Sequence, residues 1–153
     1  MTVTDVRVGD HVHAVVDHLN AAGVLAGHGA PPDGHGWQGP PGQSEFARYA
    51  IVWRIGSKDR ARWSLQGDVD EGRVTVFVRC FGGTISEAQE LLDDAAAALL
   101  ARDADGYLLQ VPGRKVLHVA QDVGTTSTET NYAETGLPEA GDYWTIRTVP
   151  GDD

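Results

Sequence analysis

The fold of this chain is decided by one stretch, Arg73-Val-Thr-Val-Phe-Val-Arg-Cys-Phe-Gly-Gly-Thr-Ile-Ser-Glu-Ala-Gln-Glu-Leu-Leu92. Its first nine residues alternate with the period of a β-strand, which places successive side chains on opposite faces. One face is a stripe of core residues: Val74, Val76, Val78 and Cys80. The other face is mixed: Thr75, Phe77, Arg79 and Phe81. A mixed face is typical of a sheet whose far side meets solvent or another subunit.

Two glycines, Gly82 and Gly83, then turn the chain into a predicted amphipathic helix that ends near residue 101. Thr84 and Glu87 have capping-box spacing, and such a cap is worth about 1 kcal/mol. The apolar stripe of this helix follows three- and four-residue steps: Ile85, Ala88, Leu91, Leu92, Ala95, Ala96 and Leu99. At first sight the junction resembles a phosphate-binding turn, but it lacks the glycine spacing of a P-loop or a dinucleotide fingerprint. A tight turn and a threonine cap account for these residues.

A second helix is predicted over residues 8–22, because apolar residues recur there at helical spacing. They are Val8, Val12, Val15, Val16 and Leu19. Gly23 supplies a left-handed stop. The segment 23–45 has no hydrophobic period, and seven glycines and four prolines fall between Gly23 and Gly42. We expect a long irregular loop there, of a length that is usually functional or mobile.

Alternation predicts four further strands, at 49–55, 62–66, 115–120 and 142–149. Turns are expected at 56–59 and 67–72, and a second long, polar loop at 124–141. The order is helix, long loop, three strands, helix, strand, long loop, strand, which is typical of an α+β fold. We therefore predict a single domain, residues 1–153, in which a mainly antiparallel sheet of four to five strands packs with two helices.

Composition limits the classes of function. The 153 residues carry 12 basic and 22 acidic side chains, a net charge of −10, which argues against a protein that grips nucleic-acid phosphates. The single cysteine, Cys80, excludes an internal disulfide and a Cys-rich zinc site. No signal peptide is visible, and the longest apolar stretch, 95–101, is far short of the roughly 20 residues that span a bilayer. We expect a soluble, intracellular protein with no membrane partner.

Histidines are the candidate metal ligands: His11, His13, His18, His28 and His35. On a helix His11 and His18 share a face two turns apart, which is too far to grip one ion unaided, and His13 points elsewhere. Solvated surface histidines are the simpler interpretation. No metal ligand and no cofactor is expected.

Catalytic groups are also not assembled by this sequence. Its serines lack the Gly-x-Ser-x-Gly setting of a nucleophile elbow, and Cys80 lies on the valine stripe as a small core residue. The acidic groups Asp93-Asp94 and Asp68/Asp70/Glu71 are most simply solvated surface. The sequence predicts a non-catalytic protein, with no catalytic residue.

Trp37 stands among glycines and prolines in the first long loop. A tryptophan in such a loop is either buried within its own chain or serves as an interface anchor. The sequence leaves both interpretations open.

The pattern as a whole resembles the tail terminator subunits of long-tailed bacteriophages, also called tail completion or minor tail proteins. The segments that carry the resemblance are Tyr49-Ala-Ile-Val-Trp-Arg-Ile55, Arg73–Phe81, Ile85-Ser-Glu-Ala-Gln-Glu-Leu-Leu92 and Tyr143-Trp-Thr-Ile-Arg147. The resemblance spans most of the chain and rests on pattern and order, with no invariant catalytic motif. The chain departs from the family pattern in its Gly/Pro-rich segment 23–45.

This resemblance implies a virion structural protein at the head-proximal end of the tail, assembled in the host cytoplasm. Such subunits form a ring, usually of six copies, that caps the tail tube, ends its polymerisation and joins it to the head connector. The implied partners are other copies of the chain, the tail tube protein and the connector protein. DNA passes the lumen without specific binding, and an acidic wall suits that passage because it repels the duplex.

Candidate residues for a subunit or tube interface are Trp37, Phe77, Arg79, Phe81, Tyr143 and Arg147. Two alternatives stay open. One is a head-completion or connector subunit. The other is a small bacterial binding domain that uses its histidine-containing loop to hold a ligand or a metal.

Overall fold

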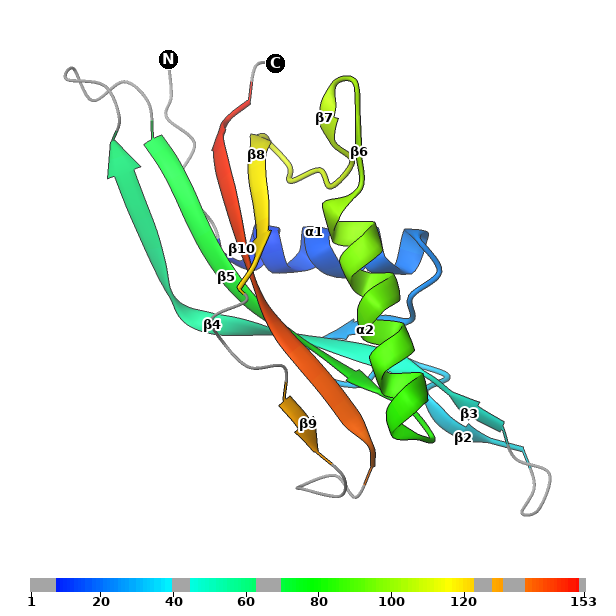
Figure 1. Ribbon diagram of the computed structural model, residues 1–153. Coiled ribbons are helices and arrows are strands. Elements are labelled where there is room, and N and C mark those ends of the chain that lie inside the picture. The colour runs from blue at the N-terminus through cyan, green and yellow to red at the C-terminus, as the bar shows by residue number, and fades with distance from the viewer. Residues whose placement is uncertain (1–7, 40–44, 63–69, 123–127, 131–136, 152–153) are drawn as a thin grey trace.

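The computed structural model describes residues 8–39, 45–62, 70–122, 128–130 and 137–151 (Figure 1). Its centre is a six-stranded sheet of order β1-β4-β5-β10-β8, with β9 also pairing with β10. The strands of this sheet are β1 (Ala26–His28), β4 (Tyr49–Arg62), β5 (Asp70–Phe81), β8 (Arg114–Gln121), β9 (Thr128–Thr130) and β10 (Glu139–Pro150). Only β1 and β4 pair in parallel among these described strands. The predicted α+β class with a mainly antiparallel sheet is confirmed.

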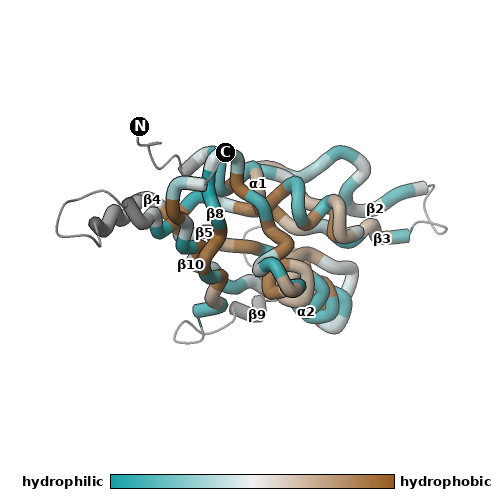
Figure 2. Tube along the Cα trace, turned by 90° about the horizontal axis from the view of Figure 1, so that it is seen from above, coloured by the Kyte–Doolittle hydropathy of each residue, from teal (hydrophilic) through white to brown (hydrophobic). Residues whose placement is uncertain are grey.

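Two helices, α1 (Val8–Ala21) and α2 (Ile85–Leu100), lie on the same side of the sheet (Figure 2). The main core fills the space between them and the strands, as the valine stripe of β5 predicted. Its fully buried side chains include Val74, Val76, Val78, Cys80, Leu99, Trp144 and Ile146. Removing this apolar surface from water, at roughly 25 cal/mol per Å², is the main force that holds helices and sheet together.

The junction between β5 and α2 is capped, with one difference from the predicted capping box. The Glu87 amide donates to Thr84 Oγ1 at 3.2 Å, as predicted. The Glu87 carboxylate accepts from the amide of Gly83 at 2.7 Å, one residue before the expected partner. Both bonds satisfy amides that the helix itself cannot pair.

The predicted turn at 56–59 is wrong. β4 continues through these residues to Arg62. The pairing of β4 with β5 is interrupted only by a register shift between Arg54 and Lys58. The local preference for a turn is overridden here because pairing with the long antiparallel strand β5 provides hydrogen bonds for the backbone N–H and C=O groups of β4. β5 likewise begins at Asp70, inside the predicted turn 67–72. The remainder of the predicted strand 62–66 lies outside the described residues.

The segment 23–45 is not wholly irregular, which corrects the prediction of one long loop. Ala26–His28 adds to the sheet as β1, and β2 (Gly36–Gln38) pairs with β3 (Glu45–Ala47). We call the β2–β3 pair the arm; it projects from one end of the molecule, opposite the end at which β4 stops and β5 begins (Figure 1).

The second predicted loop, 124–141, is also interrupted. It contains β9, and β10 begins at Glu139. Two shorter strands were not predicted: β6 (Arg102–Asp103) and β7 (Gly106–Tyr107) form a small hairpin after α2.

A buried polar network joins α1 to β8 and β10, and it corrects the assignment of His11 to the surface. His11 is fully buried, and its Nε2 lies 2.8 Å from Thr148 Oγ1. Arg114 Nε donates to the same hydroxyl at 3.1 Å. His11 occupies the inner side of α1 together with Val12 and Val15, so a hydroxyl partner replaces the water it would otherwise bind.

Candidate subunit interface

The face of the sheet opposite the helices, here called the open face, carries a row of three aromatic side chains. Trp53 on β4 is paired in register with Phe77 on β5, and Phe77 with Tyr143 on β10. The rings of Phe77 and Tyr143 lie 4.6 Å apart, and all three residues are half-buried. A contiguous aromatic row with exposed surface is typical of an interaction site.

Gly141 explains how Phe77 lies flat on this face. A Cβ at position 141 would meet Phe77 Cζ at 2.5 Å, so only glycine leaves room for the ring. The Phe77 ring therefore packs directly on the backbone of β10 at Gly141, and this packing fixes the orientation of the ring.

Arg79 lies beside the aromatic row. Its guanidinium donates to the Glu139 carboxylate at 2.6 Å and lies over the Trp53 ring at 5.6 Å and the Phe81 ring at 5.8 Å. A quarter of the Arg79 side chain stays exposed, whereas Glu139 is almost fully buried. The ion pair holds the guanidinium near the two rings and leaves part of the side chain exposed.

Phe81 does not contribute surface. It is 1% exposed and stacks on Tyr49 with ring centroids 4.8 Å apart, in a second apolar cluster that also includes Ile51. The strand face was predicted correctly, but at this end other residues of the same chain cover it. In this conformation Phe81 supports its neighbours and has no surface left for a partner.

Arg147 lies further along the same face. It is half-buried on β10, paired in register with Arg73 of β5 on one side and with His118 of β8 on the other. Strand alternation places Arg147 and Arg73 on the same face as Tyr143 and Phe77. The described part of the open face therefore combines an aromatic row with three arginines.

Trp37 is exposed at the arm, with 61% of its surface in contact with solvent. Its ring makes an edge contact with Phe46 at 5.2 Å, and Phe46 in turn stacks at 6.1 Å on Tyr49. Of the two interpretations left open by the sequence, burial within the chain is excluded for the described structure. An apolar side chain of this size, held out on a hairpin, has the properties of an interface anchor.

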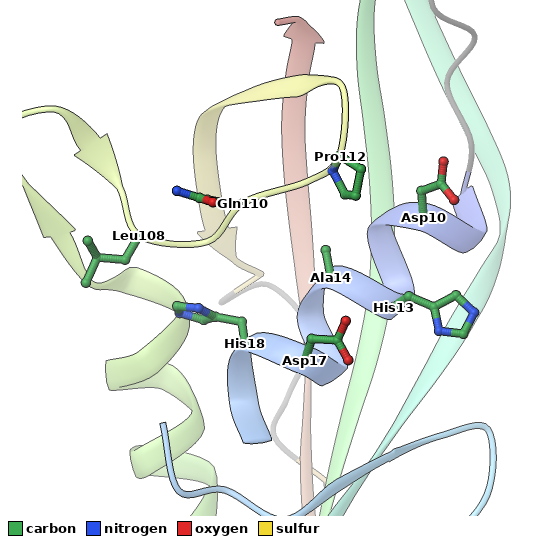
Figure 3. Close-up of a pocket in the computed structure, with 8 residues that line it drawn as sticks. All are labelled: Asp10, His13, Ala14, Asp17, His18, Leu108, Gln110 and Pro112. Atoms are coloured by element: carbon green, nitrogen blue, oxygen red, sulfur yellow. The ribbon is translucent and has the colours of Figure 1, made fainter. Parts of the chain in front are cut away.

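The histidines do not assemble a metal site in the described part of the chain, where no group of three or more His, Cys, Asp or Glu side chains could hold an ion. A shallow hollow beside α1 is lined by Asp10, His13, Ala14, Asp17, His18, Leu108, Gln110 and Pro112. Figure 3 shows His13 and His18 pointing in opposite directions from α1. His18 Nε2 is held by the carbonyl oxygen of Ala98 at 2.7 Å.

His13 contacts His28 instead, edge to face, with ring centroids 4.6 Å apart. Burial, and to a lesser degree the charge of His13, lowers the pKa of His28. The two rings connect α1 to the last residue of β1.

Cys80 lies in the main core, as predicted. Burial, together with the charge of Asp94, raises the pKa of its thiol to about 12. The group is therefore a protonated apolar side chain at neutral pH.

Comparison with known proteins gives a likeness of fold. No protein-family model and no curated protein matches the sequence. A solved chain from the virion of a native gene transfer agent (GTA) particle is similar in structure, with a TM-score of 0.50 and 12% identity. The match covers 93% of this chain and 91% of the solved one, so the likeness extends over nearly the whole fold. None of the described helices is long and apolar enough to cross a membrane.

The sequence did not single out two residues of this face, Trp53 and Gly141. The neighbours of Trp53 across the sheet depend on strand register, which alternation does not give. Gly141 was assigned to a loop, and only its strand pairing shows that it makes room for Phe77.

Proposed function

We propose that the protein is a virion structural subunit, a tail terminator that forms a ring at the head-proximal end of a tail tube. The observation that carries the proposal is the fold shared, over nearly the whole length of both chains, with a chain of the GTA virion. The sequence pattern supports the same assignment, because its strand, turn and helix order resembles tail terminators.

The surfaces of the chain agree with a role in assembly. An exposed tryptophan on a projecting arm and a half-buried aromatic row are features that proteins use to hold partners. The net charge of −10 suits a ring whose lumen passes DNA without retaining it. Ring formation, the end of tube polymerisation and the joining of tail to connector are the actions that follow from this proposal, and none of them requires a catalytic residue or a cofactor.

Deletion of the gene from the phage or prophage that carries it tests the proposal. The expected result is tail tubes of uncontrolled length that do not join heads, as seen by electron microscopy, with full rescue by the wild-type chain. Tails of unchanged, uniform length that still join heads would refute it.

A head-completion or connector subunit is the closest competing function, since the same fold likeness supports any structural role in a virion. Deletion would then leave tails of normal length beside heads that leak or lack their DNA. A metal-binding function has less support, because His11 is buried against Thr148 and His18 is bonded to a carbonyl oxygen of α2. Stoichiometric zinc or nickel in protein purified without a tag would favour it.

A further inference from the structure

A small hollow lies where the arm meets the start of α2 (Figure 1). Its volume is about 420 Å³, a size typical of sites that bind small groups. Gly83 lets the arm and the helix approach each other closely, because a Cβ there would lie 3.3 Å from Cβ of Phe46. The described residues that line the hollow come from these two distant segments: Trp37, Glu45, Phe46, Gly83, Thr84 and Glu87.

Two aromatic rings belong to the arm side of this hollow. The rings of Trp37 and Phe46 lie 5.2 Å apart and meet at 81°, so they form two perpendicular walls. Because 61% of Trp37 is exposed, much of its indole is open to a partner. The face of an indole ring carries negative partial charge and attracts a cation placed within about 6 Å of its centre.

Two carboxylates also line the hollow. Glu45 is exposed, and its side chain makes no ion pair or hydrogen bond within the described ranges. Glu87 Oε2 accepts from the amide of Gly83 at 2.7 Å, and none of the described cations is paired with it. This bond, together with the Thr84 cap, compensates the positive end of α2, so the helix start does not oppose the binding of a cation.

No lysine or arginine is among the described residues that line the hollow. Residues 23–47, which include the whole arm, contain neither residue type. Arg48, the next residue, is paired with Glu90 at 3.2 Å, one helical turn beyond Glu87. By contrast, the two hollows beside the β6–β7 hairpin both have Lys115 in their walls. The hollow at the arm therefore joins aromatic rings to carboxylates and needs a cation from outside the chain to neutralise it.

We propose that this hollow binds an arginine side chain of a partner protein. The guanidinium stacks on Trp37 and donates hydrogen bonds to the carboxylate of Glu45, and Glu87 adds a second negative charge. Arginine suits the hollow better than lysine, because its planar group stacks on aromatic rings and donates two parallel hydrogen bonds to one carboxylate. This inference goes beyond the proposed function and does not depend on it, since it concerns binding by the isolated chain.

NMR titration of the full chain with a short peptide, acetyl-Gly-Arg-Gly-amide, tests the proposal. The resonance of the Trp37 indole N–H is identified by its loss in the Trp37→Ala spectrum. Millimolar peptide is expected to shift this resonance and the amide of Glu45 in a saturable way. The same peptide with citrulline in place of arginine keeps the shape without the charge, and it is expected to give no saturable shift. A lysine peptide is expected to bind more weakly than the arginine peptide.

Substitutions test which groups hold the guanidinium. Trp37→Ala and Glu45→Gln are each expected to weaken the dissociation constant of the arginine peptide about threefold or more. Asp93→Asn is the matched control, because Asp93 is an exposed carboxylate of α2 that does not line the hollow. We expect it to change the dissociation constant by less than about 1.5-fold at physiological salt. Unchanged melting temperatures show that these three variants keep the fold, since all three side chains are exposed.

Four results would overturn the proposal. They are the absence of saturable shifts with the arginine peptide, equal shifts with the citrulline peptide, unchanged affinity in Trp37→Ala, and shifts centred on Glu90, Asp93 and Asp94. Guanidinium chloride at the same millimolar concentrations separates a free cation from a protein side chain. It is expected to bind more weakly than the arginine peptide, and equal affinity would overturn the assignment to a partner protein.

Discussion

Gly82 is expected to be the position of the strand–helix junction that tolerates substitution least. A Cβ on Gly82 would lie 2.6 Å from the amide nitrogen of Ala88, 2.7 Å from Cβ of Glu87 and 2.9 Å from the carbonyl oxygen of Thr84. These atoms form the first turn of α2, so Gly82→Ala forces the helix away from β5. Gly82 and Gly83 are absent from the described glycines with positive φ, so space is the requirement.

The expected magnitude follows from two opposing effects. Overpacking against a fixed neighbour costs about 1–3 kcal/mol, and replacing glycine recovers about 0.4–1 kcal/mol by restricting the unfolded chain. Because three atoms at the site lie closer than 3.0 Å, we expect a net loss of about 2 kcal/mol for Gly82→Ala. For a chain of this length that loss corresponds to a fall of roughly 4–8 °C in melting temperature.

Gly83→Ala is the matched control. There the nearest atoms are Glu87 Oε2 at 3.1 Å and Phe46 Cβ at 3.3 Å, and the first is the end of a flexible side chain. We expect a change within about 0.5 kcal/mol. Thermal and urea unfolding, followed by circular dichroism at several protein concentrations, measures both variants. Equal stabilities of the two variants would refute the argument that Gly82 is required for close packing of strand and helix.

Three further predictions concern buried or paired groups. Thr148→Val removes the hydroxyl shared by His11 and Arg114 and is expected to cost about 2–4 kcal/mol, whereas Thr148→Ser keeps it and is expected to cost about 1 kcal/mol or less; equal urea midpoints would contradict this. Burial, with a nearby carboxylate, raises the pKa of Cys80 from 9.0 to about 12, so the folded protein holds roughly 500-fold less thiolate than the unfolded chain at pH 9. The buried, protonated Cys80 thiol therefore makes its full contribution to folding stability below pH 9, and this contribution declines as pH rises toward 12. Iodoacetamide labelling of Cys80 in the native protein as fast as in the unfolded chain would contradict this. Burial, and then the charge of a neighbouring histidine, lowers the pKa of His28 below 6.5, so its protonation destabilises the fold as pH falls through 6.5. An NMR titration of His28 with a midpoint at or above 6.5 would contradict that.

The sequence was sufficient for the local structure around residues 73–101. Strand alternation, the two glycines and the Thr84 cap all reflect interactions between residues close in the chain, and each was found as expected. Helical spacing also predicted α1, whose apolar residues Val12, Val15, Val16 and Leu19 face the core.

Interactions between distant segments account for what was missed. His11 was assigned to solvent because nothing near it in sequence shows that Thr148 approaches it. Residues 26–28 were assigned to a loop, since a three-residue strand is stabilised by its partner in β4 and not by its own composition. The aromatic row depends on the register of three strands, which the alternation of each strand leaves undetermined.

The central claim is that this chain is a structural subunit at the junction between tail and head. Electron cryomicroscopy of the particles assembled with this protein tests it most directly, by locating the chain in the density. We predict a closed ring of copies at the head-proximal end of the tail tube. Particles that lack the chain, or that hold it away from the tail, would contradict the account.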